Sequence, residues 1–224
     1  MRRPLFFLAS NRYRWCRFAR KFVAMTPITD LSQLDPDGHY TYADYLTWRF
    51  TEYVELIKGR IMRKMSAPTE QHQLISSSLH GEIYAYLKGK PCRVYAAPFD
   101  VRLFRSTGNG DAQVKTVVQP DISVLCDLAK LDRRGCVGAP DWIIEIVSPS
   151  SLALDTRTKF DLYAENGVRE YWIAYPGEQT ITAYTLAANE QYELTGTYAE
   201  PGPMRSTTLP DLLIDWNDIF QVLP

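Results

Sequence analysis

This 224-residue sequence has few cysteines, no long apolar run and no excess of one charge. Its four cysteines form no CxxC pair, so we expect no disulfide, no structural zinc site and a reducing compartment, the cytoplasm. No apolar run approaches the roughly 20 residues needed to cross a bilayer, so no membrane partner is expected. Lysine and arginine number 25 and aspartate and glutamate 26, for a net charge of −1. This balance excludes a polycationic DNA coat and an acidic disordered tail protein.

Positive charge is concentrated at the start of the chain. Residues 1–24 carry six arginines, one lysine and no acid; removing these seven charges from the net −1 leaves −8 for the remainder. One interpretation is a targeting peptide or a nucleic-acid arm. The simpler one, adopted here, is a basic N-terminal extension outside the fold, ahead of a start at Met25. Residues 25–224 are then expected to form a single domain without whole-domain affinity for phosphate backbones.

Hydrophobic periodicity predicts an α/β fold in which helices flank a mixed β-sheet. Helices are expected over 41–50, 68–87 and 152–166. Thr69 would cap the second helix, the apolar stripe Leu74, Leu79, Ile83 and Leu87 would follow it, and Gly167 would end the third. Strands are expected over 54–57, 61–62, 93–97, 101–104, 117–126, 141–147, 170–175, 180–186 and 191–198. A polar loop is expected over 105–115, and a terminal turn or helix over 209–220.

The most informative residue is Glu145, which interrupts an otherwise apolar strand. Burying an ionised, unpaired carboxylate costs several kcal/mol, so Glu145 requires a cation, a metal or a raised pKa. The two-residue period of a strand places Asp141 and Glu145 on the same face. Asp121 follows Pro120 in another apolar run, which indicates a strand start or bulge that directs the side chain into a cleft.

Adjacent strands would bring Asp121 and Glu145 together. Two carboxylates ~5 Å apart repel by roughly 3 kcal/mol at an effective dielectric of ~20, so a positive group must offset the repulsion. A hard divalent cation does so and keeps the water that phosphodiester hydrolysis needs. The alternative, that each acid is a surface or capping residue, is stronger for Asp121 than for Glu145.

Other residues have both a functional and a structural interpretation. Lys159 lies one turn after Asp155 and could form a surface ion pair with it, worth a few tenths of a kcal/mol, or reach over the sheet edge to the acids. Thr156, Lys159 and Tyr163 share one face of the expected helix. Glu55 could be a third carboxylate or the exposed half of a hairpin strand.

Six short runs form a combined pattern: Glu55 to Gly59, Pro68 to His72, Gln119 to Val124, Pro140 to Ser150, Asp155-x-x-x-Lys159 and Gly167 to Trp172. Together they resemble the bacterial Uma-type restriction endonuclease family, which belongs to the PD-(D/E)XK nuclease superfamily. The similarity extends from about Thr41 to Phe220, and its specificity lies in the combination of runs.

The resemblance implies a restriction-endonuclease-like fold in which Mg²⁺ or Mn²⁺ is held by two acids and a backbone carbonyl. Val147 stands where the superfamily's E-x-K pattern would place lysine, and Lys159 on the following helix is its replacement in this family. The implied site comprises the catalytic residues Glu55, Asp121, Glu145 and Lys159, Ile146 as a further metal ligand, and His72, Gln119 and Tyr163 as auxiliary residues.

The leading hypothesis is a metal-dependent DNA endonuclease in which water positioned by Lys159 attacks the scissile phosphate. Candidate phosphate contacts are Lys115, Arg133, Arg134 and Arg157. A catalytically inactive nuclease-fold protein, acting as a structural or interaction module, is the alternative that Val147 and the acidic balance favour. DNA is the expected partner, and a homodimer is left open.

Overall fold

The computed structural model describes residues 27–63, 67–104 and 110–220. The predicted N-terminal extension 1–24 and the start at Met25 lie outside the described residues, as does the first part of the loop predicted over 105–115.

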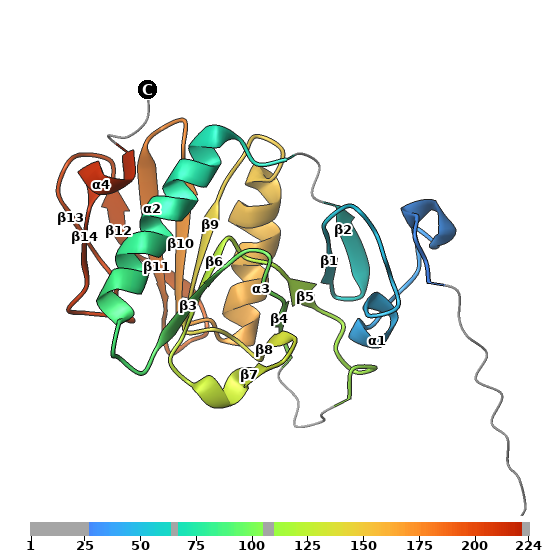
Figure 1. Cartoon of the computed structure of the whole chain (residues 1–224). Coiled ribbons are helices and arrows are strands. Elements are labelled where there is room, and N and C mark those ends of the chain that lie inside the picture. Colours follow the sequence, from blue (N-terminus) through green and yellow to red (C-terminus); the bar gives the residue numbers. More distant parts are fainter. Residues whose placement is uncertain (1–26, 64–66, 105–109, 221–224) are drawn as a thin grey trace, which may run out of the picture.

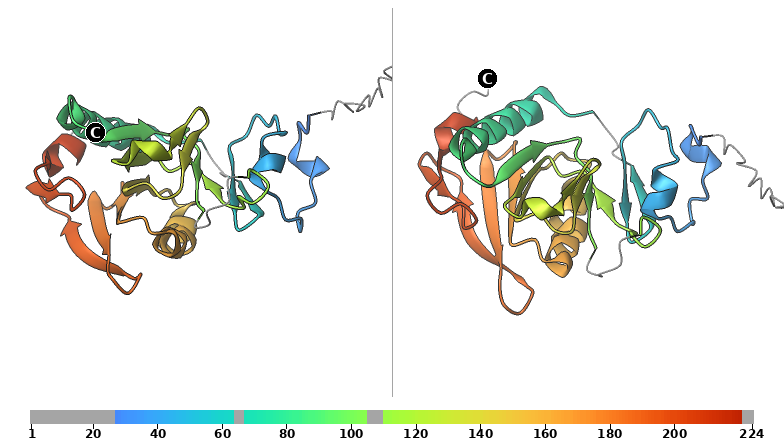
Figure 2. Two further views of the ribbon diagram at one scale, coloured as in Figure 1. Left: turned by 90° about the horizontal axis from the view of Figure 1, so that it is seen from below. Right: turned by 60° about the horizontal axis from the view of Figure 1, so that its bottom comes forward.

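Of the two six-stranded sheets, the one with the longer strands forms the centre of the fold, and a helix lies on each of its faces. Its strands are β3 (Arg93–Ala96), β6 (Ile122–Leu125), β9 (Trp142–Ile146), β10 (Glu170–Tyr175), β11 (Thr180–Leu186) and β12 (Tyr192–Tyr198), in the spatial order β12-β11-β10-β9-β6-β3. β9 and β10 are parallel and the other neighbours antiparallel, so the predicted mixed sheet is confirmed. The helix α2 (Glu70–Leu87) covers one face and α3 (Lys159–Asn166) the other (Figures 1 and 2).

Strand β9 lies between these helices, and its alternation explains both cores. Trp142, Ile144 and Ile146 face the core built with α2, whereas Ile143 and Val147 face the core built with α3. A strand covered on both faces must be nearly all apolar, as its sequence is. Glu145 therefore lies on the α3 side, in a buried layer.

Helix α2 begins after Thr69, whose hydroxyl accepts the backbone N–H of His72, as predicted for an N-cap. Its buried stripe is Ile75, Leu79, Ile83 and Leu87. The prediction of Leu74 in the stripe is wrong, because the 3.6-residue period that fits the other three residues passes through position 75.

The smaller sheet, beside the main one, contains β1 (Val54–Ile57), β2 (Arg60–Arg63), β4 (Val101–Arg102), β5 (Val117–Val118), β7 (Leu131–Asp132) and β8 (Gly135–Val137), in the order β2-β1-β5-β4-β8-β7. The predicted β1–β2 hairpin is confirmed, and Lys58 and Gly59 at its turn both have positive φ, 51° and 85°. That geometry favours glycine at the second position.

The helix predicted over 41–50 is much shorter, since α1 spans only Tyr42–Tyr45. After it the chain turns so that Trp48 forms a β-bridge with Ile28, which is incompatible with a continued helix. Two further short helices are η1 (Leu31–Gln33) and η2 (Leu128–Lys130).

The single strand predicted over 117–126 is two strands in different sheets. β5 pairs with β1 and β4, whereas β6 pairs with β3 and β9. Pro120 stands between them and has no backbone N–H, so it cannot continue a ladder.

The C-terminal segment contains the hairpin β13 (Pro203–Arg205) and β14 (Leu213–Asp215), followed by α4 (Trp216–Phe220). Its apolar side chains pack on the α2 face of the main sheet. The predicted turn or helix over 209–220 is thus part strand and part helix.

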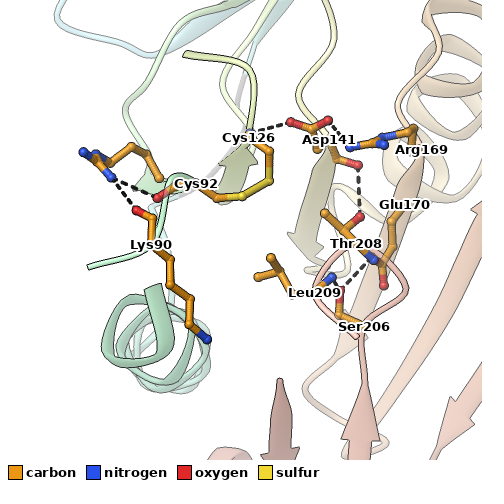
Figure 3. Close-up of a disulfide and its surroundings, with 10 residues drawn as sticks. Lys90, Cys92, Cys126, Asp141, Arg169, Glu170, Ser206, Thr208 and Leu209 are labelled. Carbon is orange, nitrogen blue, oxygen red and sulfur yellow. Dashed lines mark hydrogen bonds and ion pairs between the residues drawn. A yellow bond between two sulfur atoms is a disulfide. The ribbon is translucent and has the colours of Figure 1, made fainter. Parts of the chain in front are cut away.

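The expectation of no disulfide is wrong, because Cys92 and Cys126 form one (Figure 3). Arg93 is the register partner of Leu125 in the β3–β6 ladder, so the residues one step further out on each strand meet. The two cysteines are 34 residues apart, and only the pairing of these strands reveals their proximity. A disulfide is typical of oxidising compartments, which removes the basis for expecting a reducing one.

Candidate active site

Asp121 and Glu145 meet where the chain crosses between the two sheets. The Ile146 N–H donates to Asp121 Oδ2 at 2.8 Å, and the Asp121 N–H lies 3.4 Å from Glu145 Oε2. Pro120 lies between β5 and β6 and cannot take part in strand pairing. The Asp121 side chain, instead of a backbone carbonyl, therefore accepts the Ile146 N–H of β9. The predicted convergence of the two acids is therefore present.

Lys159 is enclosed among carboxylates. Its Nζ lies 2.9 Å from Glu145 Oε1, 3.1 Å from Glu55 Oε1 and 3.6 Å from Asp155 Oδ1, and the side chain is only 1% exposed. The interpretation of Lys159 and Asp155 as a surface pair is wrong, and so is that of Glu55 as an exposed strand residue, since its side chain is 2% exposed. The Lys159 amine therefore contacts Glu145 and Glu55, two of the predicted acids.

A π-helical turn, η3 (Leu154–Thr158), leads into α3 and helps to direct these side chains. The Lys159 N–H donates to the carbonyl of Leu154, five residues back, and the carbonyl of Asp155 instead accepts the Tyr171 hydroxyl at 3.0 Å. Such turns are frequent at functional sites. Asp155, Lys159 and Tyr163 are all buried as a result, whereas Thr156 bonds back to its own helix and does not join them.

The charge balance of this cluster governs its protonation. Burial raises the pKa of Glu145 to about 8, against the lowering effect of the Lys159 ammonium. Burial alone would lower the pKa of Lys159, but Glu145, Glu55 and Asp155 hold it well above its usual value. Lys159 is therefore a cation, and it donates with the Tyr163 hydroxyl (2.7 Å) to the same oxygen of Glu145.

Two further contacts hold the acids in place. His72 Nε2 lies 3.2 Å from Asp121 Oδ2, and among the described residues its buried Nδ1 has no hydrogen-bond partner. The backbone N–H of Gln119 donates to Glu55 Oε1 at 2.7 Å. The Gln119 side chain, by contrast, donates to Asp100 at 2.9 Å and does not reach the acids.

Sequence reasoning missed two of these residues. Asp155 has i,i+4 spacing to Lys159, which fits an exposed pair as well as a buried one, and the π-helical turn that contains Asp155 has no clear sequence signal. Asp100 had no signal at all, since its partners Tyr42, Tyr45 and Gln119 are distant in the chain.

The cluster adjoins an open cleft of about 590 Å³ between the β1–β2 hairpin and the first turns of α2. The lining residues that bear on function are Tyr53, Arg63, Pro68, His72, Gln119 and Asp121. Glu145 and Lys159 lie behind Asp121, in the buried layer. Of the acids in the cluster, Asp121 is thus the one that lines the cleft.

The donors suit a hard cation. In the part of the chain that the structure describes, no three His, Cys, Asp or Glu side chains form a metal-binding group. Mg²⁺, however, is commonly held by one or two carboxylates together with water and substrate phosphates. The β6–β9 register pairs Ile122 with Ile144, and two residues further on it would place Pro120 opposite Ile146. Proline cannot donate to the Ile146 carbonyl, which fits its predicted role as a ligand.

The predicted phosphate contacts Lys115, Arg133, Arg134 and Arg157 are exposed but do not line the cleft. Arg134 is engaged by Asp111 at 2.8 Å. Arg63 is the arginine that lines the cleft among the described residues, and no sequence pattern distinguishes it from other surface arginines.

Three comparisons place the chain among known proteins. A model of the Uma2 family, described as "Putative restriction endonuclease", matches residues 42–217. "Uncharacterized protein slr1290" of Synechocystis sp. is 28% identical over 151 residues, covering 64% of this chain and 69% of that protein. A crystal structure described as a "putative nuclease belonging to DUF820", from Anabaena variabilis, has a TM-score of 0.64 at 24% identity, covering 83% of this chain and 99% of that chain. The structural likeness confirms the predicted α/β fold with a mixed β-sheet. None of the helices in the described ranges combines the length and apolarity that crossing a bilayer requires.

Proposed function

The chain belongs to the Uma2 family of putative restriction endonucleases, and on this premise we propose that it is a metal-dependent DNA endonuclease that hydrolyses phosphodiester bonds. The observation that carries the proposal is the arrangement at the cleft. Asp121 faces the open space, and the buried pair of Glu145 and Lys159 supports it from behind. A structural protein has no need for a cluster of five buried charged side chains beside a cleft, because burying charge is costly.

We further propose that Asp121, Glu145 and the Ile146 carbonyl hold Mg²⁺ or Mn²⁺. Such an ion supplies Lewis-acid stabilisation of phosphate charge and lowers the pKa of its water. The protein's own part is to fix its donors. His72 and the Ile146 N–H orient Asp121, while Lys159 and Tyr163 hold one oxygen of Glu145 and leave the other toward Asp121.

Lys159 is proposed to act as a protonated group. Its high pKa excludes it as a general base at neutral pH, so its contribution is positive charge and hydrogen-bond donation. Glu55 in turn anchors Lys159 and the backbone of Gln119, which ties the hairpin to the segment that carries Asp121.

The first test is plasmid nicking in Mg²⁺ or Mn²⁺. We expect Asp121→Asn, which keeps the side chain's size, to abolish nicking because the amide is a poor ligand for a hard cation. Asp161→Asn, on the exposed side of α3, is the matched control and should nick like the unmodified protein. Nicking by Asp121→Asn at the unmodified rate would refute the assignment.

One observation favours a second candidate, a catalytically inactive module. Val147, at the position of the superfamily lysine, packs in the apolar core beside α3. Lys159 also balances part of the buried negative charge without an added ion. This candidate predicts no thermal shift with divalent cations and no cleavage of single- or double-stranded DNA.

A further inference from the structure

The part of the cleft lining contributed by the β1–β2 hairpin carries two side chains that the proposed chemistry does not use. Tyr53 directly precedes β1 and is 58% exposed. Arg63 ends β2 and is the register partner of Val54, so the two residues lie at the same end of the hairpin. An aromatic ring left exposed on a cleft wall offers a flat apolar surface to a bound molecule.

Arg63 forms a weak, exposed ion pair with Glu52. Its Nη2 and Nε lie 2.8 Å and 3.1 Å from Glu52 Oε2, with both side chains about half exposed (56% and 51%). Exposed pairs of this kind contribute little to stability, so the guanidinium can exchange partners at low cost. Arg63 donates to both carboxylate oxygens of Glu52, and a phosphate group offers a similar pair of acceptor oxygens.

Apart from Arg63, the described residues that line the cleft include no lysine or arginine, and Glu52 and Asp121 are acidic. Proteins that bind duplex DNA through its backbone neutralise several phosphates at once with lysine and arginine side chains. One arginine beside one exposed aromatic ring instead suits a single nucleotide, because in single-strand sites each base stacks on an aromatic side chain while a basic group contacts the backbone.

We propose that the cleft holds one unpaired nucleotide of a DNA strand, with its base stacked on Tyr53 and a phosphate bound by Arg63 in exchange for Glu52. The cleft volume of about 590 Å³ lies within the range of small-molecule sites. The inference rests on the proposed function and names its substrate class, single-stranded or locally unpaired DNA.

The test is fluorescence anisotropy with a dye-labelled single-stranded oligonucleotide, in EDTA so that neither metal nor cleavage takes part. Tyr53→Ala should weaken binding about tenfold, in line with the loss of one stacked base. Tyr84→Ala is the matched control, because Tyr84 is equally exposed (55%) but lies on α2 away from the cleft lining. It should bind like the unmodified protein.

The salt dependence separates the two contacts. Arg63→Gln should weaken binding and reduce the slope of log K against log salt by about 0.7, the value for one phosphate on a single strand. Tyr53→Ala should leave that slope unchanged. Glu52→Gln should tighten binding because it removes the competing carboxylate. Arg205→Gln, at an exposed position of β13, should change nothing.

A duplex of the same sequence that binds as tightly as the single strand would overturn the inference, and so would equal affinities of the Tyr53→Ala and Tyr84→Ala variants. Undetectable binding of the single strand would do the same. These outcomes are independent of nicking. If Asp121→Asn abolishes nicking while Tyr53→Ala binds normally, the nuclease proposal stands and only the single-strand site falls.

Discussion

At the scale of single residues, the site depends on one buried cation. Lys159 is shared by Glu145, Glu55 and Asp155, all of which are nearly inaccessible to solvent. In the sequence Lys159 was ambiguous, because a lysine four residues after an aspartate is ordinarily a surface residue. What resolved it was the position of its helix over β9, which depends on contacts between residues far apart in the chain.

Replacing Lys159 by methionine should lower the free energy of unfolding by about 3–5 kcal/mol, since it leaves buried carboxylates without their cation. The loss should grow with pH. Without the ammonium the folded-state pKa of Glu145 rises further above its unfolded value, and stability from such a group is present below the unfolded pKa and lost as pH rises. Urea unfolding at pH 5 and pH 8 measures both effects.

Lys58→Met is the control for this experiment, because Lys58 forms an exposed pair with Glu165 (63% and 52% exposed). Its replacement should cost at most about 1 kcal/mol. Equal, small losses for the two lysine variants would contradict the account of Lys159.

At the scale of elements, the disulfide joins β3 to β6, the strand that begins beside Asp121. Neighbouring contacts support the same region, since Asp141 accepts the Cys126 N–H and pairs with Arg169 (Figure 3). Because the disulfide joins residues 34 positions apart, it should raise the free energy of unfolding by about 2–4 kcal/mol. The sequence could not reveal the pair because strand pairing was not predictable from local pattern.

The double variant Cys92→Ala/Cys126→Ala should therefore unfold at lower urea concentration than the unmodified protein. Adding a thiol reductant should move the unmodified protein toward the variant and leave the variant unchanged. Coincident unfolding curves for the unmodified protein with and without reductant would show that the disulfide contributes no stability. In a reducing cytoplasm, the location first expected, the reduced form would be the relevant one.

At the scale of the whole molecule, local pattern predicted the elements with strong periodicity and missed what non-local contacts decide. Helix α2 and strand β9 follow from their apolar spacing, and the acid inside β9 pointed to the site. The division of 117–126 between two sheets did not follow, although Pro120 was recognised as a break. The cleft itself is formed by segments from the hairpin, α2 and the β5–β6 crossing, so no single stretch of sequence encodes it.

The central claim, that two acids distant in sequence hold a divalent ion, is tested most directly by calorimetric titration of Mn²⁺ at pH 8 into the unmodified protein, Asp121→Asn, Glu145→Gln and the control Asp161→Asn. We expect saturable binding to the unmodified protein and the control, and its loss in the other two. Affinity of the unmodified protein should fall at pH 6.5, because a carboxyl with a pKa of about 8 must release its proton to bind a metal. Four indistinguishable isotherms would contradict the claim.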